Sequence, residues 1–87
     1  MAISLDLLSA DALDICRSLA RGGRLESDRM GVFVHTPHFS KGRPHTLPES
    51  VARELTDKHL ISQAGTNPAT HETVWRLTYK GWMAAAR

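Results

Sequence analysis

The chain has 87 residues and a formal net charge of +2. This length fits one small domain with a single modest core and leaves no room for a separate ligand-sensing domain. No apolar run approaches the roughly 18 residues that a membrane span needs, and the N-terminus lacks the basic and apolar regions of a secretory signal. We therefore expect a cytoplasmic protein that makes no membrane contact and acts through its surface or as an oligomer.

The first predicted helix begins after Ser9, runs to about Arg21 and is ended by two glycines. Its apolar residues recur at helical spacing, which predicts a stripe that faces the core. The residues of this stripe are Leu8, Ala12, Ile15, Cys16 and Leu19. Because Cys16 is the only cysteine, it cannot form an internal disulfide, and we expect a buried structural thiol in a reducing compartment.

The next part of the chain is mostly polar and contains one strand. Residues 24–29 are typical of a turn, whereas residues 30–35 include a run of valine and phenylalanine with strong strand preference. Residues 36–45 are rich in proline and show no apolar period. We interpret them as a loop or as the return arm of a hairpin with residues 30–35.

A second helix is predicted from Leu47, with Thr46 as its cap and Glu49 placed to reach back to Thr46. Pro48 suits the first turn, where a missing N–H has no partner to lose. Apolar residues then recur every four positions as far as Leu55, so one face should lie on the core. The opposite face carries Ser50, Arg53, Glu54 and Asp57.

A hairpin is predicted after this helix. Residues 60–61 begin a strand, residues 65–68 are strong turn formers, and residues 73–79 alternate between apolar and polar side chains. This alternation places Trp75 and Leu77 inward, with Val74 and Arg76 outward.

The chain closes on a short helix that Thr78 is placed to cap. A helix of about two turns is marginal unless it packs against something. Trp82 therefore either completes the core against the first helix or lies in a homodimer contact formed by the first helix and Trp82.

One set of residues in the C-terminal part of the chain has a family-specific order: Val51, Leu55, Leu60, Ile61, Trp75, Leu77, Thr78 and Gly81. This order resembles the second half of a winged helix-turn-helix domain of the MarR and PadR type, with its recognition helix, strand, wing and aromatic-x-Leu-Thr-x-x-Gly ending. His59 stands where the family usually has a glycine, and residues 36–45 stand where its second helix would lie. The resemblance implies an α+β fold: one winged-helix domain over residues 1–87 with a degenerate or missing second helix.

The core that we expect for this fold combines residues from every predicted helix and strand except the last helix. Its members are Leu8, Ile15, Leu19, Phe33, Val51, Leu55, Leu60, Trp75 and Leu77.

The resemblance also implies binding to double-stranded DNA, as a transcriptional regulator or accessory factor. With the second helix in a major groove, Ser50 and Arg53 would face the bases, and Arg53 could hold a guanine edge by two hydrogen bonds. Contacts to phosphates or to a minor groove would come from the preceding loop and the wing. The residues are Lys41, Arg43, His71, Thr73 and Arg76.

A second hypothesis is a protein-binding winged-helix module, such as a phage- or plasmid-type modulator or inhibitor of a larger nucleoprotein complex. Glu49, Glu54 and Asp57 would repel a phosphate-lined groove unless they are paired or turned away. The position of the charges separates the two hypotheses, because a protein partner suits a mixed-charge or apolar patch. DNA binding needs one surface that holds Lys41, Arg43, Arg53 and Arg76.

Metal binding and catalysis have little support in the sequence. His35, His38 and His45 have spacing that could hold zinc, but no second cysteine exists and no acid falls between Asp28 and Glu49. We also find no glycine-rich phosphate loop, no nucleophile with a recognisable base and no paired carboxylates. We therefore expect a protein without enzymatic activity, metal or cofactor.

Overall fold

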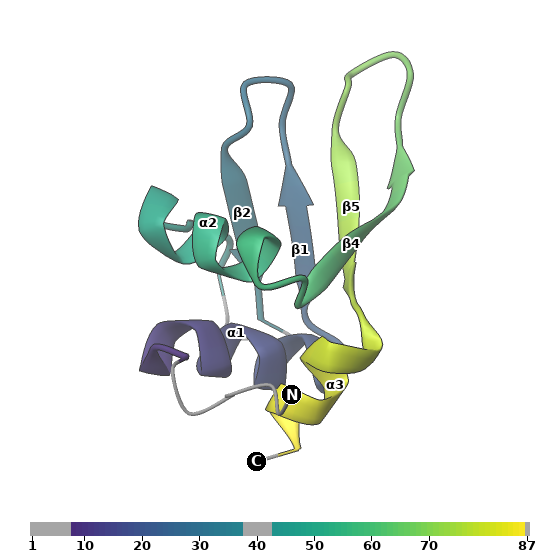
Figure 1. The fold of residues 1–87 in the computed structure, drawn as a ribbon. Helices are drawn as coiled ribbons and strands as arrows, with labels where there is room; N and C mark the ends of the chain where they lie inside the picture. Colours follow the sequence, from purple (N-terminus) through teal and green to yellow (C-terminus); the bar gives the residue numbers. More distant parts are fainter. Residues whose placement is uncertain (1–7, 38–42, 87) are drawn as a thin grey trace.

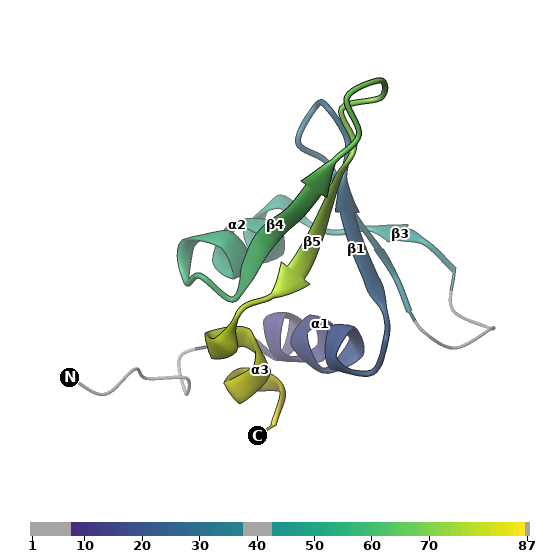
Figure 2. The ribbon, with the colours of Figure 1, turned by 90° about the vertical axis from the view of Figure 1, so that its right-hand side faces the viewer.

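Three helices and five antiparallel strands form the described part of this computed structural model, which comprises residues 8–37 and 43–86. Figures 1 and 2 show their arrangement from two sides. In chain order the elements are α1 (Ala10–Ala20), β1 (Arg24–Ser27), β2 (Phe33–Thr36), β3 (His45–Thr46), α2 (Glu49–Asp57), β4 (Ile61–Thr66), β5 (Thr73–Leu77) and α3 (Tyr79–Ala85).

The strands form one sheet in the order β3-β2-β1-β5-β4. Leu25 in the middle strand pairs with His35 of β2 on one side and with Trp75 of β5 on the other. Since successive side chains of a strand point to opposite faces, these three residues share one face of the sheet, and Arg24 and Glu26 lie on the other. The sheet therefore has one face that enters the core and one that does not.

All three helices lie against one face and one end of the sheet (Figures 1 and 2). At the other end, the β1–β2 and β4–β5 hairpins project away from α1 and α3 (Figure 1). The core lies between the helices and the covered face of the sheet. Its buried apolar residues are Leu8, Ala12, Ile15, Cys16, Leu25, Leu47, Val51, Leu55, Leu60, Ile61 and Ala84.

The predicted α+β class is confirmed, and the arrangement is compatible with a winged-helix-like fold. Helix α2 leads directly into β4, and β4 and β5 form a hairpin whose second strand pairs with β1. The short strands β2 and β3 occupy the chain between β1 and α2, where a second helix would otherwise lie. No helix in residues 8–37 and 43–86 is long and apolar enough to cross a membrane.

The prediction of a turn at residues 24–29 is wrong for residues 24–27, which form β1, and holds for Asp28 and Arg29. Leu25 is fully buried and Ser27 is also buried, while Arg24 is exposed. One large apolar residue in four gives no visible period, so pairing with β2 and β5 decides the conformation rather than local preference.

The strand predicted at residues 30–35 begins later, at Phe33. The carboxylate of Asp28 accepts hydrogen bonds from the backbone N–H groups of Met30 and Val32, and Gly31 has φ of 82°. These features close a turn between β1 and β2. The return-arm alternative is confirmed at β3, which pairs with β2, while residues 38–42 lie outside the described part of the chain.

The predicted capping of the second helix by Thr46 is wrong. Thr46 pairs with Val34 in the sheet, and the Leu47 N–H donates to the Phe33 carbonyl, so the strand continues up to the helix. Pro48 is the N-cap residue, and no side chain caps this end. Helix α2 consequently starts at Glu49 rather than at Leu47.

The turn of the second hairpin lies further along the chain than residues 65–68, because Gly65 and Thr66 belong to β4. The turn is closed at Asn67, whose side chain accepts from the Ala69 N–H and whose carbonyl accepts from the His71 N–H. The predicted cap of α3 is confirmed, since the Thr78 hydroxyl accepts from the Gly81 N–H.

His59, directly after Lys58 at the end of α2, has φ of 56°, in the left-handed region that glycine adopts most readily. Helical periodicity placed Val51 and Leu55 in the core correctly. Four other predicted core residues are only partly buried: Leu19, Phe33, Trp75 and Leu77. Trp82 keeps 52% of its surface exposed, so it does not complete the core of the monomer as the first alternative proposed.

Candidate recognition surface on α2

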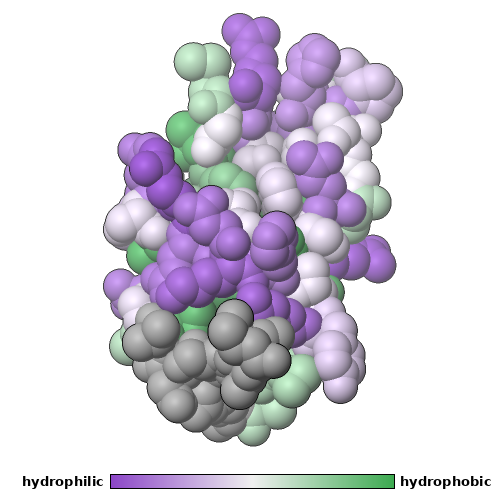
Figure 3. Space-filling model, viewed as in Figure 1, coloured by the Kyte–Doolittle hydropathy of each residue, from purple (hydrophilic) through white to green (hydrophobic). Residues whose placement is uncertain are grey.

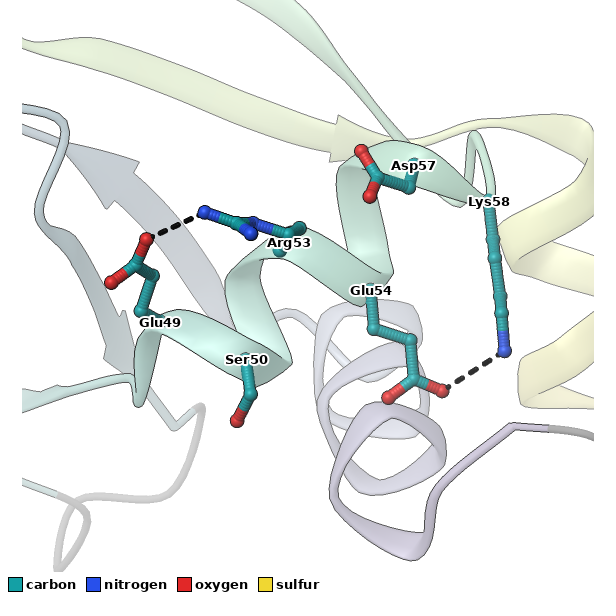
Figure 4. Close-up of a pocket in the computed structure, with 6 residues that line it drawn as sticks. All are labelled: Glu49, Ser50, Arg53, Glu54, Asp57 and Lys58. Atoms are coloured by element: carbon teal, nitrogen blue, oxygen red, sulfur yellow. Dashed lines mark hydrogen bonds and ion pairs between the residues drawn. The ribbon is translucent and has the colours of Figure 1, made fainter.

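The solvent-facing side of α2 is a shallow hollow of about 530 Å³ that contains only polar and charged residues. We call this surface the α2 face. Figure 3 shows it as a hydrophilic band across the molecule, and Figure 4 shows its side chains. Its residues are Glu49, Ser50, Arg53, Glu54, Asp57 and Lys58.

Arg53 and Glu49 form an ion pair one helical turn apart on this face. The guanidinium Nη2 lies 2.7 Å from the carboxylate Oε1, and both side chains are largely exposed. Exposed pairs of this kind contribute only about 0.3–0.5 kcal/mol, so solvent or a ligand can displace either partner. Arg53 is therefore available to a partner, but its charge is balanced in the free protein.

Glu54 points toward α1 rather than toward solvent (Figure 4). Its two carboxylate oxygens accept hydrogen bonds of 2.8 Å from the Ser9 N–H and 2.7 Å from the Ser9 hydroxyl. The Lys58 ammonium lies 3.4 Å from the same carboxylate. Burial by itself raises the pKa of Glu54, but the hydrogen bonds from Ser9 and Lys58 outweigh it and hold the pKa below its ordinary value.

The sum of the formal charges on the α2 face is negative, because three acids face two bases. Glu49 and Glu54 have cationic partners, while Asp57 is exposed and pairs with no described residue. Approach to DNA requires that the acids of α2 are paired or turned away from the phosphates. Two of the three acids are paired, so the requirement is met in part. The three acids leave no excess of positive charge.

The residues predicted to contact phosphates do not gather around the α2 face. Arg76 lies between Trp75 and Leu77, which face the core, so its side chain is on the sheet face away from α2. Arg43 lies two residues before β3, at the opposite edge of the sheet from the β4–β5 hairpin. Lys41 lies outside the described residues.

Two predicted contact residues do lie on the side of the sheet that faces α2 or at its hairpin tip. Thr73 has the orientation of Trp75, and its hydroxyl lies 3.1 Å from that of Thr66 across the hairpin. His71 is exposed in the turn, with φ of 60°. The structure therefore brings Ser50 and Arg53 together on α2 and places Thr73 and His71 on the neighbouring hairpin. Arg43 and Arg76 lie apart from these four residues.

His35 and His45 lie side by side. The Nδ1 atom of His35 lies 3.4 Å from Nε2 of His45, and the other ring nitrogen of His35 lies 2.7 Å from the Ser18 hydroxyl. Burial, followed by the charge of His45, lowers the pKa of His35. Among the described residues, no group of three or more histidine, cysteine or acidic side chains is placed to hold a metal ion. His38 lies outside those residues.

Cys16 is fully buried in the core, as predicted. Burial, with a smaller contribution from the charge of Glu54, raises the pKa of the thiol to about 11. Since the thiolate is the reactive form, this cysteine is held in its unreactive state at neutral pH.

Sequence reasoning did not identify the two partners of Glu54, which are Ser9 and Lys58. The spacing of four residues between Glu54 and Lys58 on a helix was a usable signal for their contact. No local pattern could identify Ser9, because it comes from the start of α1 and meets Glu54 only in the folded chain.

Comparison with known proteins adds no relative to this description: no protein-family model, curated protein or solved structure matches the chain.

Proposed function

We propose that this chain is a cytoplasmic protein-binding module of winged-helix type that docks on its partner through the α2 face. The observation that carries the proposal is the charge of that face, which has both signs, two internal ion pairs and a negative sum. Binding to a nucleic-acid backbone depends on neutralising phosphates with excess positive charge. Complementary charges of both signs instead favour a protein partner and set its orientation.

The α2 face also indicates the chemistry of the partner. Asp57 is the exposed acid without a partner among the described residues, and Arg53 is held only by a weak surface pair. A protein surface that sets a cationic side chain against Asp57 and an acidic one against Arg53 would satisfy both. A modulator or inhibitor of a larger nucleoprotein complex, of the phage or plasmid type, fits such a role.

The test is affinity capture from a host extract with the wild-type protein and two charge reversals. Asp57→Lys changes the α2 face, and Glu72→Lys makes the same change of net charge at the exposed end of the β4–β5 hairpin. We expect a partner that is retained by wild type and by Glu72→Lys and is lost with Asp57→Lys. Retention by both variants, or the absence of any partner sensitive to Asp57, would contradict docking through α2.

DNA binding through the same helix is a second candidate, favoured by the position of α2 beside a projecting hairpin and by the pairing of two of its acids. In this case Ser50 and Arg53 would face the bases and His71 and Thr73 would contact the backbone. Anisotropy with a mixed pool of duplex DNA at about 50 and 200 mM salt tests it. Micromolar binding that falls steeply with salt and is weakened by Arg53→Ala would favour DNA, and no binding at low salt would favour the protein partner.

A further inference from the structure

The sheet face away from the helices carries a row of four polar side chains, one from each of four adjacent strands. Arg24 of β1 pairs with Thr36 of β2, and Arg76 of β5 pairs with Ser62 of β4. Strands β1 and β5 are antiparallel neighbours, and Leu25 pairs with Trp75. The residue before Leu25 is therefore opposite the residue after Trp75, which places Arg24 opposite Arg76. We call this set, Thr36, Arg24, Arg76 and Ser62, the arginine row.

The arginine row is accessible to solvent. Its neighbours along the strands, Leu25 and Trp75, face the core, so the row points away from the helices. Arg24, Arg76 and Ser62 are exposed, and Thr36 is half-buried. No helix of the described chain covers this side of the sheet (Figure 2).

The charges of the row are incompletely balanced within the protein. Like charges directly opposite each other on neighbouring strands are unfavourable. Glu26 approaches Arg24 at 3.7 Å, while no described carboxylate pairs with Arg76. The Arg24 contact is a surface pair between partly exposed side chains, so its net contribution is small. An anion between the two arginines would relieve their repulsion.

An exposed aromatic ring lies beside the two arginines at the middle of the row. Trp82 lines a hollow of about 340 Å³ together with Arg76 and Gly23, the residue before Arg24. About half of the surface of Trp82 is exposed. An exposed tryptophan beside arginines is a platform on which a nucleic-acid base can stack, because every base has an aromatic face.

From these observations we infer that the open face of the sheet binds a single-stranded nucleic acid, with phosphates along the arginine row and a base stacked on Trp82. Strands lie about 4.8 Å apart, so a row over four strands spans about 14 Å. Each strand of B-form DNA carries one phosphate per about 3.4 Å of helix axis, so a row of this length can contact more than one phosphate.

The surroundings of the row favour a single strand over a duplex. A second hollow, nearer the hairpin tips, is lined by three acids and makes that end of the sheet acidic. The acids are Glu26, Asp28 and Glu72. Favourable contacts are thus confined to the end near α1 and α3. Stacking on Trp82 also needs a base that is free of its own neighbours.

The test is fluorescence anisotropy with labelled single-stranded DNA and RNA of mixed sequence, at several salt concentrations, with the matching duplex for comparison. Arg24→Gln and Arg76→Gln should each weaken single-strand binding and reduce the salt slope by about 0.7. Trp82→Ala should weaken it about fivefold or more, and Trp82→Phe should retain most of it. Arg29→Gln at the β1–β2 turn and Arg53→Gln on the α2 face make the same charge change and should leave binding unaltered.

Two results would overturn the inference: no single-strand binding at about 50 mM salt, or binding that is lost with Arg53→Gln and retained by Arg24→Gln and Arg76→Gln. Preference for the duplex over the single strand would also contradict it. Size-exclusion chromatography of wild type and Trp82→Ala adds an independent check, since a shift from dimer to monomer would assign Trp82 to a homodimer contact instead. Because Arg24, Arg76 and Trp82 lie outside the α2 face, this inference and the proposed protein docking can fail separately.

Discussion

The two faces of the sheet are made from alternate residues of the same strands, and they differ in every other respect. On the covered face Leu25 and Ile61 are buried among residues of all three helices. On the open face β1, β4 and β5 place Arg24, Ser62 and Arg76 in solvent. The covered face therefore provides stability, and the open face can carry charge at no cost to the core.

The difference implies that equal substitutions should have unequal effects on the two faces. Leu25→Ala removes a fully buried side chain from the centre of the sheet, and such truncations cost about 2–5 kcal/mol. For a domain of this size, that is a large part of the total free energy of unfolding. Leu55→Ala, in the equally buried middle of α2, should cost a similar amount.

The matched control is Val74→Ala, next to Trp75 on the open face and only half-buried. It should change the free energy of unfolding by less than about 1 kcal/mol. Urea denaturation of the three variants measures both values. If Val74→Ala destabilised the protein as much as Leu25→Ala, the open face would have to be buried, by a partner copy or otherwise.

The buried residues of the helices were predictable from the sequence, whereas those of the short strands were not. Val51 and Leu55 repeat over several turns, so their shared face is visible without any tertiary information. Strand β1 has four residues and β3 has two, which is too short for an alternating pattern to stand out. Leu25 was therefore missed, although it is the buried residue at the middle of the sheet.

For the candidate binding residues, the sequence likewise predicted which side chains are exposed but not how they are arranged in the folded protein. Alternation in β5 correctly placed Arg76 outward, but the sequence does not show that outward means away from α2. That relation depends on which sheet face the helices cover, and thus on the packing of α1, α2 and α3 together. The exposed residues of α2 were identified from the helical period, whereas the contact of Glu54 with Ser9 joins residues 45 positions apart.

Two glycines differ in the space that surrounds them: Gly81 is closely packed, whereas Gly65 is not. A Cβ at Gly81 would collide with the Leu60 carbonyl oxygen and the Leu77 side chain, because α3 approaches the covered side closely there. Gly65 in the projecting hairpin has open space where a Cβ would stand. Gly81→Ala should cost about 1–3 kcal/mol despite the better helix preference of alanine.

Gly65→Ala should be neutral or slightly stabilising, since glycine inside a strand costs about 0.5–1 kcal/mol relative to alanine. Thermal melts of the two variants provide the measurement. A Gly81→Ala protein that melts at or above the wild-type temperature would show that α3 does not lie as close to Leu60 as described.

The smallest effect concerns two glutamates of α2 with different surroundings. Glu54 accepts hydrogen bonds from Ser9 and ties α2 to the start of α1, whereas Glu49 is exposed and holds only Arg53. Glu54→Gln should cost about 1–2 kcal/mol at neutral pH, because it weakens charge-assisted hydrogen bonds. Glu49→Gln should cost no more than about 0.5 kcal/mol.

The pH dependence identifies the source of this difference. The pKa of Glu54 is lower in the folded protein than its ordinary value of 4.5, so the unfolded chain binds more protons between the two values. The stabilisation by Glu54 is complete above the ordinary pKa and is lost as the pH falls through the folded one. Urea denaturation at a series of pH values measures the free energy of unfolding of wild type and of Glu54→Gln. The difference between the two values should become smaller below pH 4.5. A difference of constant size would mean that the glutamine disturbs the packing of α1 on α2 rather than removing a charge.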